Sequence, residues 1–535
     1  MTAWRTSEVA RAIEVRRPDG GIAMTRIEAP TLASRLAGGV WGHLIGDAAG
    51  VPYEFAPPSS IGDVVFGKAG GPWRQPAGTW SDDGALMLAL LDSLLTGRFD
   101  PADQGARALA WADDGAYTPD GDGRFDIGGT TSAAMAALRR GVAATDAGPT
   151  DERAAGNGSL MRILPLALVE RAPRTDARAP ARRVSDERLV RDAHAASRVT
   201  HGHVRCQVAC ALYALIVRRL LAGDEPAMAL AAARRQLRGI YGRDRALAGH
   251  LAALDDLEAW TDRTGSGYVV DSFWSAWDAF AGARDYEETV VRAISYGNDT
   301  DTTAAIAGGL AGVHWGWQSI PVAWRRAMRG REVATPHADR LATTTGLWLH
   351  RTRTSTDSPL RLDGIDLSGT RAAPGRLVIT FLPGKKRDGY TGPHWRDVDL
   401  DAARLRDGGI EALFLLVEDV ELGWCLVPDL PEALAATGVQ LIRFPIRDPH
   451  TPTPAQDPDF RVTIADLVAR LGAGDRIAVA CRGGVDRSGM AAACILVEAG
   501  LDPEAAIERV QQGRKGSLKY GDQQEYVRDW RRSEA

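Results

Sequence analysis

The pattern of apolar and polar positions changes character near residue 350. Before that point, apolar residues recur at helical spacing in segments such as 32–49, 129–140 and 210–223, many of them rich in alanine. No alternating strand pattern persists in this part of the chain. The periodicity therefore predicts an all-α domain over residues 29–350.

The last third of the chain has a different texture. Short apolar, β-branched runs alternate there with helical segments, which predicts an α/β domain with a central, mainly parallel sheet over 375–535. The stretch 351–374 is rich in Thr, Ser, Asp and Pro without periodicity, so it is predicted to be a linker. Residues 1–28 are polar and charged, which predicts an N-terminal tail rather than a signal peptide. The strand-like runs are LVITF (377–381), ALFLLV (412–417), QLIRFPI (440–446) and RIAVAC (476–481).

Composition narrows the function classes. A chain of 535 residues can bury two or more full cores. A net charge of −5 gives no indication of a nucleic-acid partner, and no run is long and apolar enough to suggest a membrane span. The 5 cysteines form no CxxC motif and no paired framework, which favours a reducing cytoplasm.

One acidic loop precedes a run of small residues. In SYGNDTDTTAAIAGGLAGVHWG (295–316), Asp299 and Asp301 are one residue apart and are followed by Thr302. Two carboxylates and a hydroxyl at a helix start form an oxygen-rich group, and hard cations such as Mg²⁺ take oxygen ligands. The small residues let another helix approach closely. On this loop alone, a metal site and simple helix capping both stay open.

A second acidic loop favours the metal. Ser81, Asp82, Asp83 and Gly84 precede the apolar run ALMLALLDSLL. Adjacent carboxylates repel and raise each other's pKa unless a cation neutralises them. Two such helix starts, far apart in sequence, can meet around a pair of cations.

Two further stretches suit a substrate. The loop DDGAYTPDGDGRFDIGG (113–129) does not fit the EF-hand spacing, so it is interpreted as a substrate-side loop, with Gly129 opening the next helix. The turn GNGSLMR (156–162) places Asn157, Gly158 and Ser159 before an apolar segment, where exposed backbone N–H groups suit an anionic ligand.

Five motifs together resemble a known family. They occur in the order found in the ADP-ribosylglycohydrolases, and the resemblance covers roughly residues 30–350. It implies hydrolysis of the N- or O-glycosidic bond of an ADP-ribosyl adduct. The motifs are GDAAGVPYE (46–54), SDDG (81–84), NGSLMR (157–162), THGH (200–203) and GNDTDTT (297–303).

The resemblance also implies roles for single residues. Glu54 is expected beside the scissile bond, where it controls access to two Mg²⁺ or Mn²⁺ ions. Gly84 departs from the family pattern, which usually has Thr there, although the ligand positions before it are intact. The expected metal ligands are Ser81, Asp82, Asp83, Asp299, Asp301 and Thr302. The expected substrate-binding residues are Asp47, Gly129, Asn157, Gly158, Ser159 and His201.

The C-terminal part carries a phosphate-binding pattern. The last strand-like run leads into Cys481 and then, six residues on, Arg487, followed by Ser488 and an apolar helix. A turn of this length between a strand and a helix aims backbone N–H groups at one point. Those groups and the helix dipole bind a phosphate dianion and lower the pKa of the thiol. Arg487 can hold two phosphate oxygens, and Ser488 can assist release of the thiolate. A buried structural cysteine is the alternative, and Arg487 argues against it.

This part resembles the cysteine-dependent dual-specificity and tyrosine phosphatases, notably the cyclin-dependent-kinase-inhibitor-3-like group, over roughly 375–532. FLPGKK (381–386), WRD (395–397) and FPIRD (444–448) carry the resemblance together with the cysteine loop. It implies phosphomonoester hydrolysis without a cofactor. The implied catalytic residues are Cys481, Arg487 and the general acid Asp448, for which Asp457 and Asp459 are rivals. The implied phosphate-binding residues are Arg482, Gly483, Gly484, Val485, Asp486 and Ser488.

Two departures leave the substrate and the rate open. Ala480 stands where most of these phosphatases have His, which is expected to raise the pKa of the thiol. Asp486 directly before Arg487 is unusual for protein phosphatases. The resulting Asp-Arg-Ser ending of the loop resembles that of some phosphoinositide phosphatases.

The whole sequence predicts a cytoplasmic bifunctional hydrolase. Its expected substrates are an ADP-ribosylated protein or small-molecule adduct and a phosphorylated protein or small phosphomonoester, with no membrane partner. The alternative is an ADP-ribosyl hydrolase whose C-terminal half is a phosphate-binding targeting module with little turnover.

Overall fold

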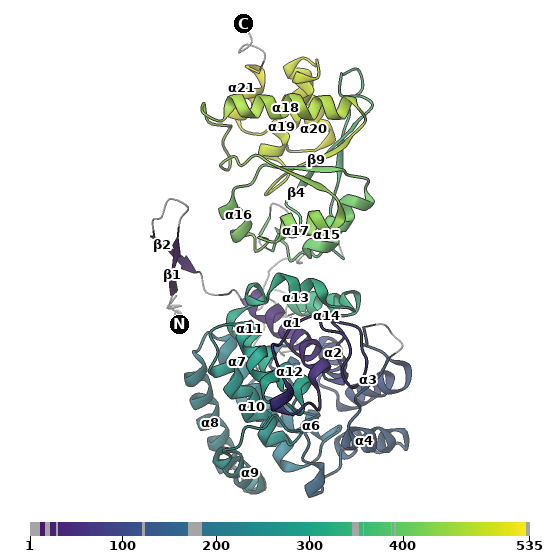
Figure 1. Cartoon of the computed structure of the whole chain (residues 1–535), viewed down its shortest axis with the longest axis vertical. Helices are drawn as coiled ribbons and strands as arrows, with labels where there is room; N and C mark the ends of the chain where they lie inside the picture. The colour runs from purple at the N-terminus through teal and green to yellow at the C-terminus, as the bar shows by residue number, and fades with distance from the viewer. Residues whose placement is uncertain are drawn as a thin grey trace. The chain divides into compact units, whose positions relative to one another are not determined.

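The chain divides into two compact units, Met1–Leu347 and Trp348–Ala535 (Figure 1). The computed structural model describes residues 11–16, 22–27, 30, 32–119, 123–169, 184–344, 353–356, 358–386, 388–389 and 392–530. Within these ranges, no helix is long and apolar enough to cross a membrane.

The first unit is a helical bundle, as the sequence predicts. A two-stranded antiparallel hairpin, β1 (Arg11–Arg16) and β2 (Ile22–Ile27), lies in the predicted N-terminal tail. The helices are α1 (Leu32–Gly50), α2 (Asp82–Leu95), α3 (Pro101–Asp114), α4 (Gly129–Arg139), α5 (Pro165–Leu168), α6 (Asp186–Arg198), α7 (Val204–Leu221), α8 (Pro226–Arg243), α9 (Ala248–Ala259), α10 (Val269–Ala281), α11 (Tyr286–Ser295), α12 (Thr300–Trp315), α13 (Val322–Ala327) and α14 (Arg331–Thr344).

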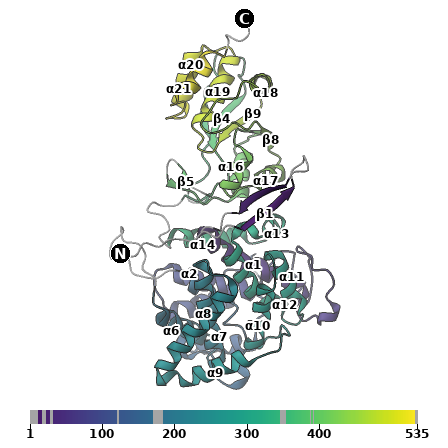
Figure 2. The same cartoon turned by 90° about the vertical axis from the view of Figure 1, so that its left-hand side faces the viewer.

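Two antiparallel helices, α1 and α12, form the centre of this unit (Figure 2). Four glycines spaced four residues apart on α1 share one face, which lies against α12. A Cβ added to Gly42 would lie 2.4 Å from the backbone oxygen of Gly308. The last glycine of the series, Gly50, lies against the backbone of Asp301 in the same way. The small residues therefore let the two backbones touch, and this contact buries the acidic start of α12. The series on α1 is Gly38, Gly42, Gly46 and Gly50.

Replacing one of these glycines should separate the two helices. Gly42→Ala is expected to cost about 1–3 kcal/mol of unfolding free energy, because overpacking a close contact strains the backbone. It should also weaken divalent-cation binding at the start of α12. Gly249→Ala is the matched control, since Gly249 is an exposed position of α9 with open space around its Cβ. Urea unfolding that gave both variants the same stability would contradict the close contact.

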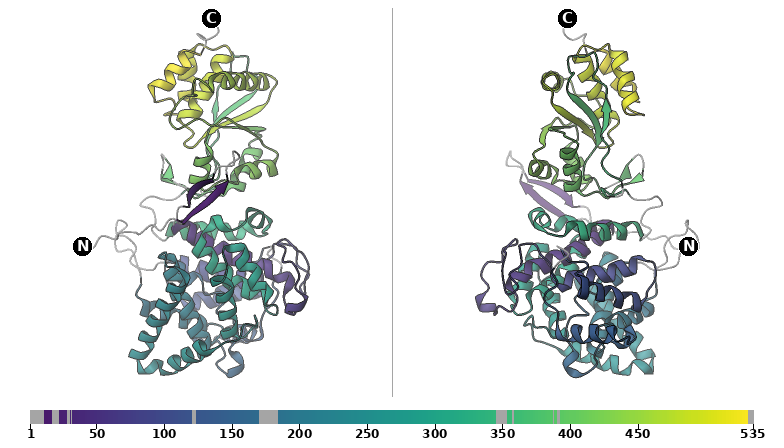
Figure 3. Two further views of the ribbon diagram at one scale, coloured as in Figure 1. Left: turned by 60° about the vertical axis from the view of Figure 1, so that its left-hand side comes forward. Right: turned by 90° about the vertical axis from the view of Figure 1, so that its right-hand side faces the viewer.

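The second unit contains a five-stranded sheet, with helices α18 to α21 against one face and α15 and α17 against the other (Figure 3). The strand order is β3-β4-β9-β7-β8, and every pair is parallel except β3 with β4. This confirms the predicted mainly parallel sheet. The strands are β3 (Asp363–Ile365), β4 (Arg376–Phe381), β7 (Ala412–Leu415), β8 (Gln440–Arg443) and β9 (Arg476–Cys481), and a separate pair is β5 (Asp388–Gly389) with β6 (Gly392–Pro393). The helices are α15 (Val398–Asp407), α16 (Asp419–Trp424), α17 (Leu430–Thr437), α18 (Asp457–Gly472), α19 (Asp486–Glu498), α20 (Pro503–Gly513) and α21 (Gly521–Arg528).

The structure differs from the predicted linker over 351–374. The edge strand β3 lies inside this stretch, and Leu360, Ile365 and Leu367 are buried. A strand of three residues is too short to show periodicity, so its isolated apolar residues are hidden among the surrounding polar ones.

Two candidate active sites

Four segments of the helical unit bring carboxylates together. They are the end of α1 with the turn after it, the start of α2, the loop before α4 and the start of α12. Oxygens of Glu54, Asp126 and Asp301 lie within 4.8 Å of one another, and so do oxygens of Asp82, Asp83 and Asp126. The structure thus joins the two acidic loops that the sequence singles out and adds a further carboxylate, Asp126.

Asp47 orients the start of α2. Its carboxylate accepts hydrogen bonds from the backbone N–H groups of Ser81 at 3.0 Å and Gly84 at 2.8 Å. Ser81 is the N-cap and accepts from the N–H of Asp83. A Cβ at Gly84 would lie 2.8 Å from the ring of Trp80, which explains why this position has no side chain. The geometry therefore gives Asp47 contacts with the helix start, whereas the sequence analysis expects it to bind substrate.

The start of α12 is tied to two other segments. Asn157 donates to the Asp299 carboxylate at 2.7 Å and to the Ser272 hydroxyl at 2.9 Å. The Thr302 hydroxyl donates to the Asp83 carboxylate at 3.2 Å, which joins α12 to α2. Asn157, expected on the substrate, thus also anchors the acidic cluster.

The cluster is electrostatically strained without a cation. Burial and the neighbouring carboxylates raise the pKa of Asp82, Asp83 and Asp301 well above the usual range. Asp83 Oδ1 and Asp301 Oδ2 are buried, and neither has a hydrogen-bond partner within the described ranges. Carboxylate and hydroxyl oxygens are the ligands of hard divalent cations, so this donor set fits a metal.

An aromatic contact places Glu54 beside the cluster. The indole N–H of Trp73 donates to the Glu54 carboxylate, and the ring of Trp73 lies 5.9 Å from that of Phe125, next to Asp126. The backbone N–H of Phe55 donates to the carbonyl of Asn298 at 2.6 Å, so the Glu54 turn is also fixed to the loop before α12.

Asp126 is a residue that sequence reasoning missed. It falls in the loop interpreted as substrate-side, but nothing there separates it from Asp113, Asp114, Asp120 and Asp122. Burial and Asp299 raise the pKa of Asp126 to about 7. In the structure, the backbone of Asp126 is left-handed, with φ of 66°, which is uncommon for a residue other than glycine and indicates a constrained position.

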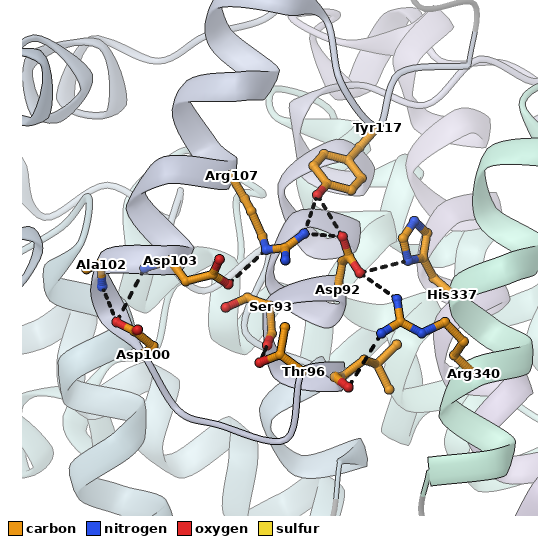
Figure 4. A network of polar contacts seen from close by, with 11 residues as sticks. Asp92, Ser93, Thr96, Asp100, Ala102, Asp103, Arg107, Tyr117, His337 and Arg340 are labelled. Atoms are coloured by element: carbon orange, nitrogen blue, oxygen red, sulfur yellow. Dashed lines mark hydrogen bonds and ion pairs between the residues drawn. The ribbon is translucent and has the colours of Figure 1, made fainter.

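A polar network holds one end of the loop that carries Asp126 (Figure 4). Asp92 on α2 accepts from Arg107, from the Tyr117 hydroxyl at 3.0 Å and from Arg340 at 2.8 Å. The indole N–H of Trp80, directly before Ser81, donates to the carbonyl of Tyr117 at 3.0 Å. The network therefore fixes this loop to the helix that begins with Asp82 and Asp83.

Two of the other expected substrate residues lie side by side. His201 and Gly158 are adjacent, since a Cβ at Gly158 would lie 2.6 Å from the imidazole. Burial lowers the pKa of His201 to about 3, so the ring is neutral, and one nitrogen bonds to the Thr200 hydroxyl at 2.9 Å. Ser159 accepts from Ser197 on α6, and Gly129 is exposed at the start of α4.

In the second unit, the loop between β9 and α19 has the form that the sequence predicts. Cys481 ends β9 and is buried, and its sulfur lies 3.3 Å from the Ser488 hydroxyl. Gly484 has φ of +63°, and a Cβ there would lie 2.5 Å from the carbonyl oxygen of Thr380. The turn thus requires glycine at this position, both for its backbone conformation and for space.

Arg487 is held by a buried carboxylate that the sequence analysis missed. Glu421 on α16 accepts two hydrogen bonds from the Arg487 guanidinium, at 2.6 and 2.7 Å. The guanidinium also donates to the carbonyls of Leu416 and Ile446. Glu421 lies in an ordinary helical segment with no motif, so only the fold reveals the pair.

Breaking this pair should be costly. Glu421→Gln is expected to lower the unfolding free energy by about 3–5 kcal/mol, because it removes the buried carboxylate that accepts two hydrogen bonds from the Arg487 guanidinium. Glu432→Gln on the exposed face of α17 is the matched control. Calorimetry of the full chain checks this, and equal unfolding temperatures for the two variants would contradict the assigned role of the pair.

The structure brings one of the three candidate acids to the cysteine loop. Asp448 forms ion pairs with Arg482 at 2.8 Å and with Arg487 at 3.2 Å. Asp457 instead pairs with Arg461 on α18, and Asp459 is exposed on the same helix.

Lys385 supplies a positive charge near the thiol. Its amine donates to the carbonyl of Arg482 at 3.1 Å, and burial lowers its pKa to about 8. Charge interactions with Cys425 and then with Cys481 partly offset this lowering of the pKa. Lys385 lies in the quoted FLPGKK segment, but its neighbour Lys386 is an equal candidate in the sequence.

Two family models match the chain. The ADP-ribosylglycohydrolase model matches residues 28–351, and the model of Cyclin-dependent kinase inhibitor 3 matches residues 355–507. The chain therefore belongs to the ADP-ribosylglycohydrolase family, with a C-terminal domain of the Cyclin-dependent kinase inhibitor 3 type.

Curated relatives match the first of these parts. The chain is 31% identical to the ADP-ribosylarginine hydrolase Tri1 of Pseudomonas putida, over 54% of this chain and 73% of the relative. It is 27% identical to the ADP-ribosyl-dinitrogen-reductase glycohydrolase of Rhodospirillum rubrum, over 55% of this chain and 90% of the relative.

Solved structures match both parts. A structure described as an ADP-ribosylglycohydrolase-related protein complex is 32% identical, with a TM-score of 0.46, over 59% of this chain and 99% of that one. A kinase associated phosphatase is 26% identical, with a TM-score of 0.30, over 33% of this chain and 96% of that one.

Proposed function

We propose that the chain is a bifunctional hydrolase that removes ADP-ribose from an adduct and hydrolyses a phosphomonoester. The first activity is supported by the buried cluster of carboxylates from separate segments. In this cluster, one oxygen of Asp83 and one of Asp301 have no hydrogen-bond partner among the described residues. The name of the Pseudomonas putida relative makes the N-glycosidic adduct of arginine the first substrate to test. The free cysteines agree with a cytoplasmic location.

The proposed cofactor is a pair of Mg²⁺ or Mn²⁺ ions. When bound, such ions orient the ribose hydroxyls and supply an activated water. The structure supports adding Asp126 to the ligand set. Glu54, fixed by Trp73, is proposed beside the scissile bond. The proposed ligands are Ser81, Asp82, Asp83, Asp126, Asp299, Asp301 and Thr302.

The remaining residues position the substrate. Asn157 keeps Asp299 in place, while the turn at Gly158 offers backbone N–H groups to an anion. The neutral imidazole of His201 has one nitrogen bonded to Thr200, so its other nitrogen is proposed to meet the ribose or adenine.

Metal removal tests the first activity. Protein freed of metal by chelation is expected to lose hydrolysis of ADP-ribosylarginine and to regain it with Mg²⁺ or Mn²⁺, whereas release of phosphate from an aryl phosphate should not change. Full ADP-ribosyl hydrolysis by protein verified as metal-free would contradict the proposal.

For the second activity, Cys481 is proposed to attack phosphorus and form a cysteinyl phosphate, which water then hydrolyses. Arg487 and the backbone of the loop hold the phosphate oxygens. Phosphorylated proteins and small phosphomonoesters are both proposed substrates.

A targeting role is the second candidate for this half. Ala480 stands where most of these phosphatases have His, and the Asp448 carboxylate forms ion pairs with Arg482 and Arg487. A burst of phosphate from an aryl phosphate would favour the enzyme. Binding of a phosphopeptide without turnover would favour a module that delivers the hydrolase to phosphorylated partners.

A further inference from the structure

We infer that Lys385 is the counter-cation of the Cys481 thiolate, and that its ammonium group supplies the positive charge that Ala480 does not. The inference rests on the proposed role of Cys481 as the nucleophile of the phosphatase. Lys385 acts on the sulfur and not on the substrate, so it is a positioning residue rather than a catalytic one.

Two contacts place the Lys385 amine next to Cys481. The residue follows strand β4, whose last residue, Phe381, pairs with Cys481 at the end of β9. The amine lies 5.0 Å from the centre of the Phe381 ring. It also donates a hydrogen bond at 3.1 Å to the carbonyl of Arg482, the residue directly after Cys481. The strand partner and the chain neighbour of the cysteine therefore both contact the amine.

The charge of Lys385 is buried without a carboxylate partner. Only 2% of the residue's surface is exposed. Within the described ranges, its amine contacts the carbonyl of Arg482 and the Phe381 ring and forms no ion pair with Asp or Glu. A buried ammonium group normally needs an opposite charge, because its removal from water is costly. A thiolate at Cys481 supplies that charge.

The neighbouring cations have carboxylate partners of their own. Arg396 forms a buried ion pair with Asp401 at 2.7 Å. Arg482 forms an ion pair with Asp448 at 2.8 Å. Both arginines face Lys385 and oppose its charge. Of these three cations, Lys385 is the one that lacks a carboxylate partner in the described part of the chain, so the anion that it balances is of another kind.

The titratable groups that face Lys385 are two thiols and one imidazole. Burial lowers the pKa of His394 to about 3, so this ring is neutral near pH 7 and offers no charge. Burial also lowers the pKa of Lys385 to about 8, whereas charge interactions with Cys425 and then Cys481 raise it. The amine is therefore mostly protonated below pH 8.

The surroundings of the two thiols decide which of them is the anion. Cys425 directly follows α16 and packs in an apolar core, which favours the neutral thiol. Cys481 instead begins the loop that leads into α19, where backbone N–H groups and the helix dipole favour a negative charge. Lys385 adds its charge to these groups from the loop after β4, while Ala480 on β9 has none to give.

The test measures alkylation of Cys481 by iodoacetamide as a function of pH in the full chain, which requires no turnover. Lys385→Met is expected to lower the alkylation rate at pH 6 about tenfold, because a thiol beside a cation loses its proton at lower pH. The difference should shrink as pH rises through about 8, where the Lys385 amine loses its proton.

Two further variants separate charge from structure. Lys385→Gln keeps a hydrogen-bond donor without the charge, so it should alkylate as slowly as Lys385→Met. Lys386→Met is the matched control, because this neighbouring lysine is also buried but donates to the carbonyl of Gly384 in its own loop. It should alkylate within about twofold of the wild type, since the amine beside Cys481 is kept.

Three outcomes would overturn the inference. The first is an alkylation rate of folded Lys385→Met equal to that of the wild type at pH 6. The second is a wild-type rate in Lys385→Gln, which would assign the effect to the hydrogen bond. The third is labelling of Cys425 instead of Cys481, identified by mass spectrometry. If the wild type released no phosphate from an aryl ester but showed the alkylation difference, the phosphatase proposal would fail and the role of Lys385 would stand.

Discussion

Asp301→Asn should abolish hydrolysis of the ADP-ribosyl adduct while leaving phosphate release from an aryl ester unchanged. Asp301 is fully buried at the start of α12, and one of its oxygens has no hydrogen-bond partner among the described residues. Mutation of a residue that hydrogen-bonds to a metal ligand typically lowers metal affinity or activity about 10–100-fold. Loss of a ligand itself should therefore lower the hydrolase activity by more than about 100-fold. Mn²⁺ bound per chain, measured by atomic absorption, should fall in parallel.

The same substitution is expected to stabilise the metal-free protein. Removing one negative charge from a buried group of carboxylates relieves their repulsion. Metal-free Asp301→Asn should therefore unfold at a higher temperature than the metal-free wild type, and added Mn²⁺ should raise its Tm less. Asp262→Asn, at an exposed position, is the matched control. Unchanged Mn²⁺ binding in Asp301→Asn would show that the cluster is not the metal site.

Cys481→Ser should eliminate phosphomonoester turnover while preserving phosphate binding. The nucleophile must be a thiolate, and a serine hydroxyl stays protonated near neutral pH and is a far weaker nucleophile. The backbone turn at Gly484 and the guanidinium of Arg487 do not depend on the sulfur, so the phosphate cradle should remain. Turnover and isothermal titration with inorganic phosphate check the two halves of this prediction.

Cys494→Ala is the control for the thiol. Cys494 is buried within α19 in the apolar core, and burial raises its pKa well above the usual range, so it is not a nucleophile. This variant should keep its turnover. If Cys481→Ser kept more than a few per cent of the wild-type rate, the covalent mechanism would be contradicted.

Contiguous motifs made most of both sites predictable. The acidic starts of α2 and α12 and the loop from Cys481 to Ser488 each combine their residues within a short stretch, so their chemistry is visible without a fold. The small residues of α12 likewise predicted a close helix contact, and the structure shows it with the glycines of α1.

Residues that act alone were not predictable. Asp126, Trp73, Glu421 and Lys385 each reach a site through tertiary contacts, and no neighbouring residue marks them as different from other charged or aromatic residues. The strand β3 was hidden for a related reason, since three residues at a sheet edge carry too little apolar pattern.

The geometry also changes the expected use of some residues. Asp47 and Asn157 hold the acidic helix starts through hydrogen bonds that only the folded chain brings together. The ion pairs of Asp448 likewise could not be read from its place after a strand.

One chain is proposed to carry two independent hydrolytic sites. The direct measurement assays wild type, Asp301→Asn and Cys481→Ser, each as the full chain with Mn²⁺, on ADP-ribosylarginine and on p-nitrophenyl phosphate. Wild type is expected to hydrolyse both substrates, Asp301→Asn to lose only the first activity and Cys481→Ser to lose only the second. Loss of both activities in either folded variant, or a wild type that hydrolyses only one substrate, would contradict it.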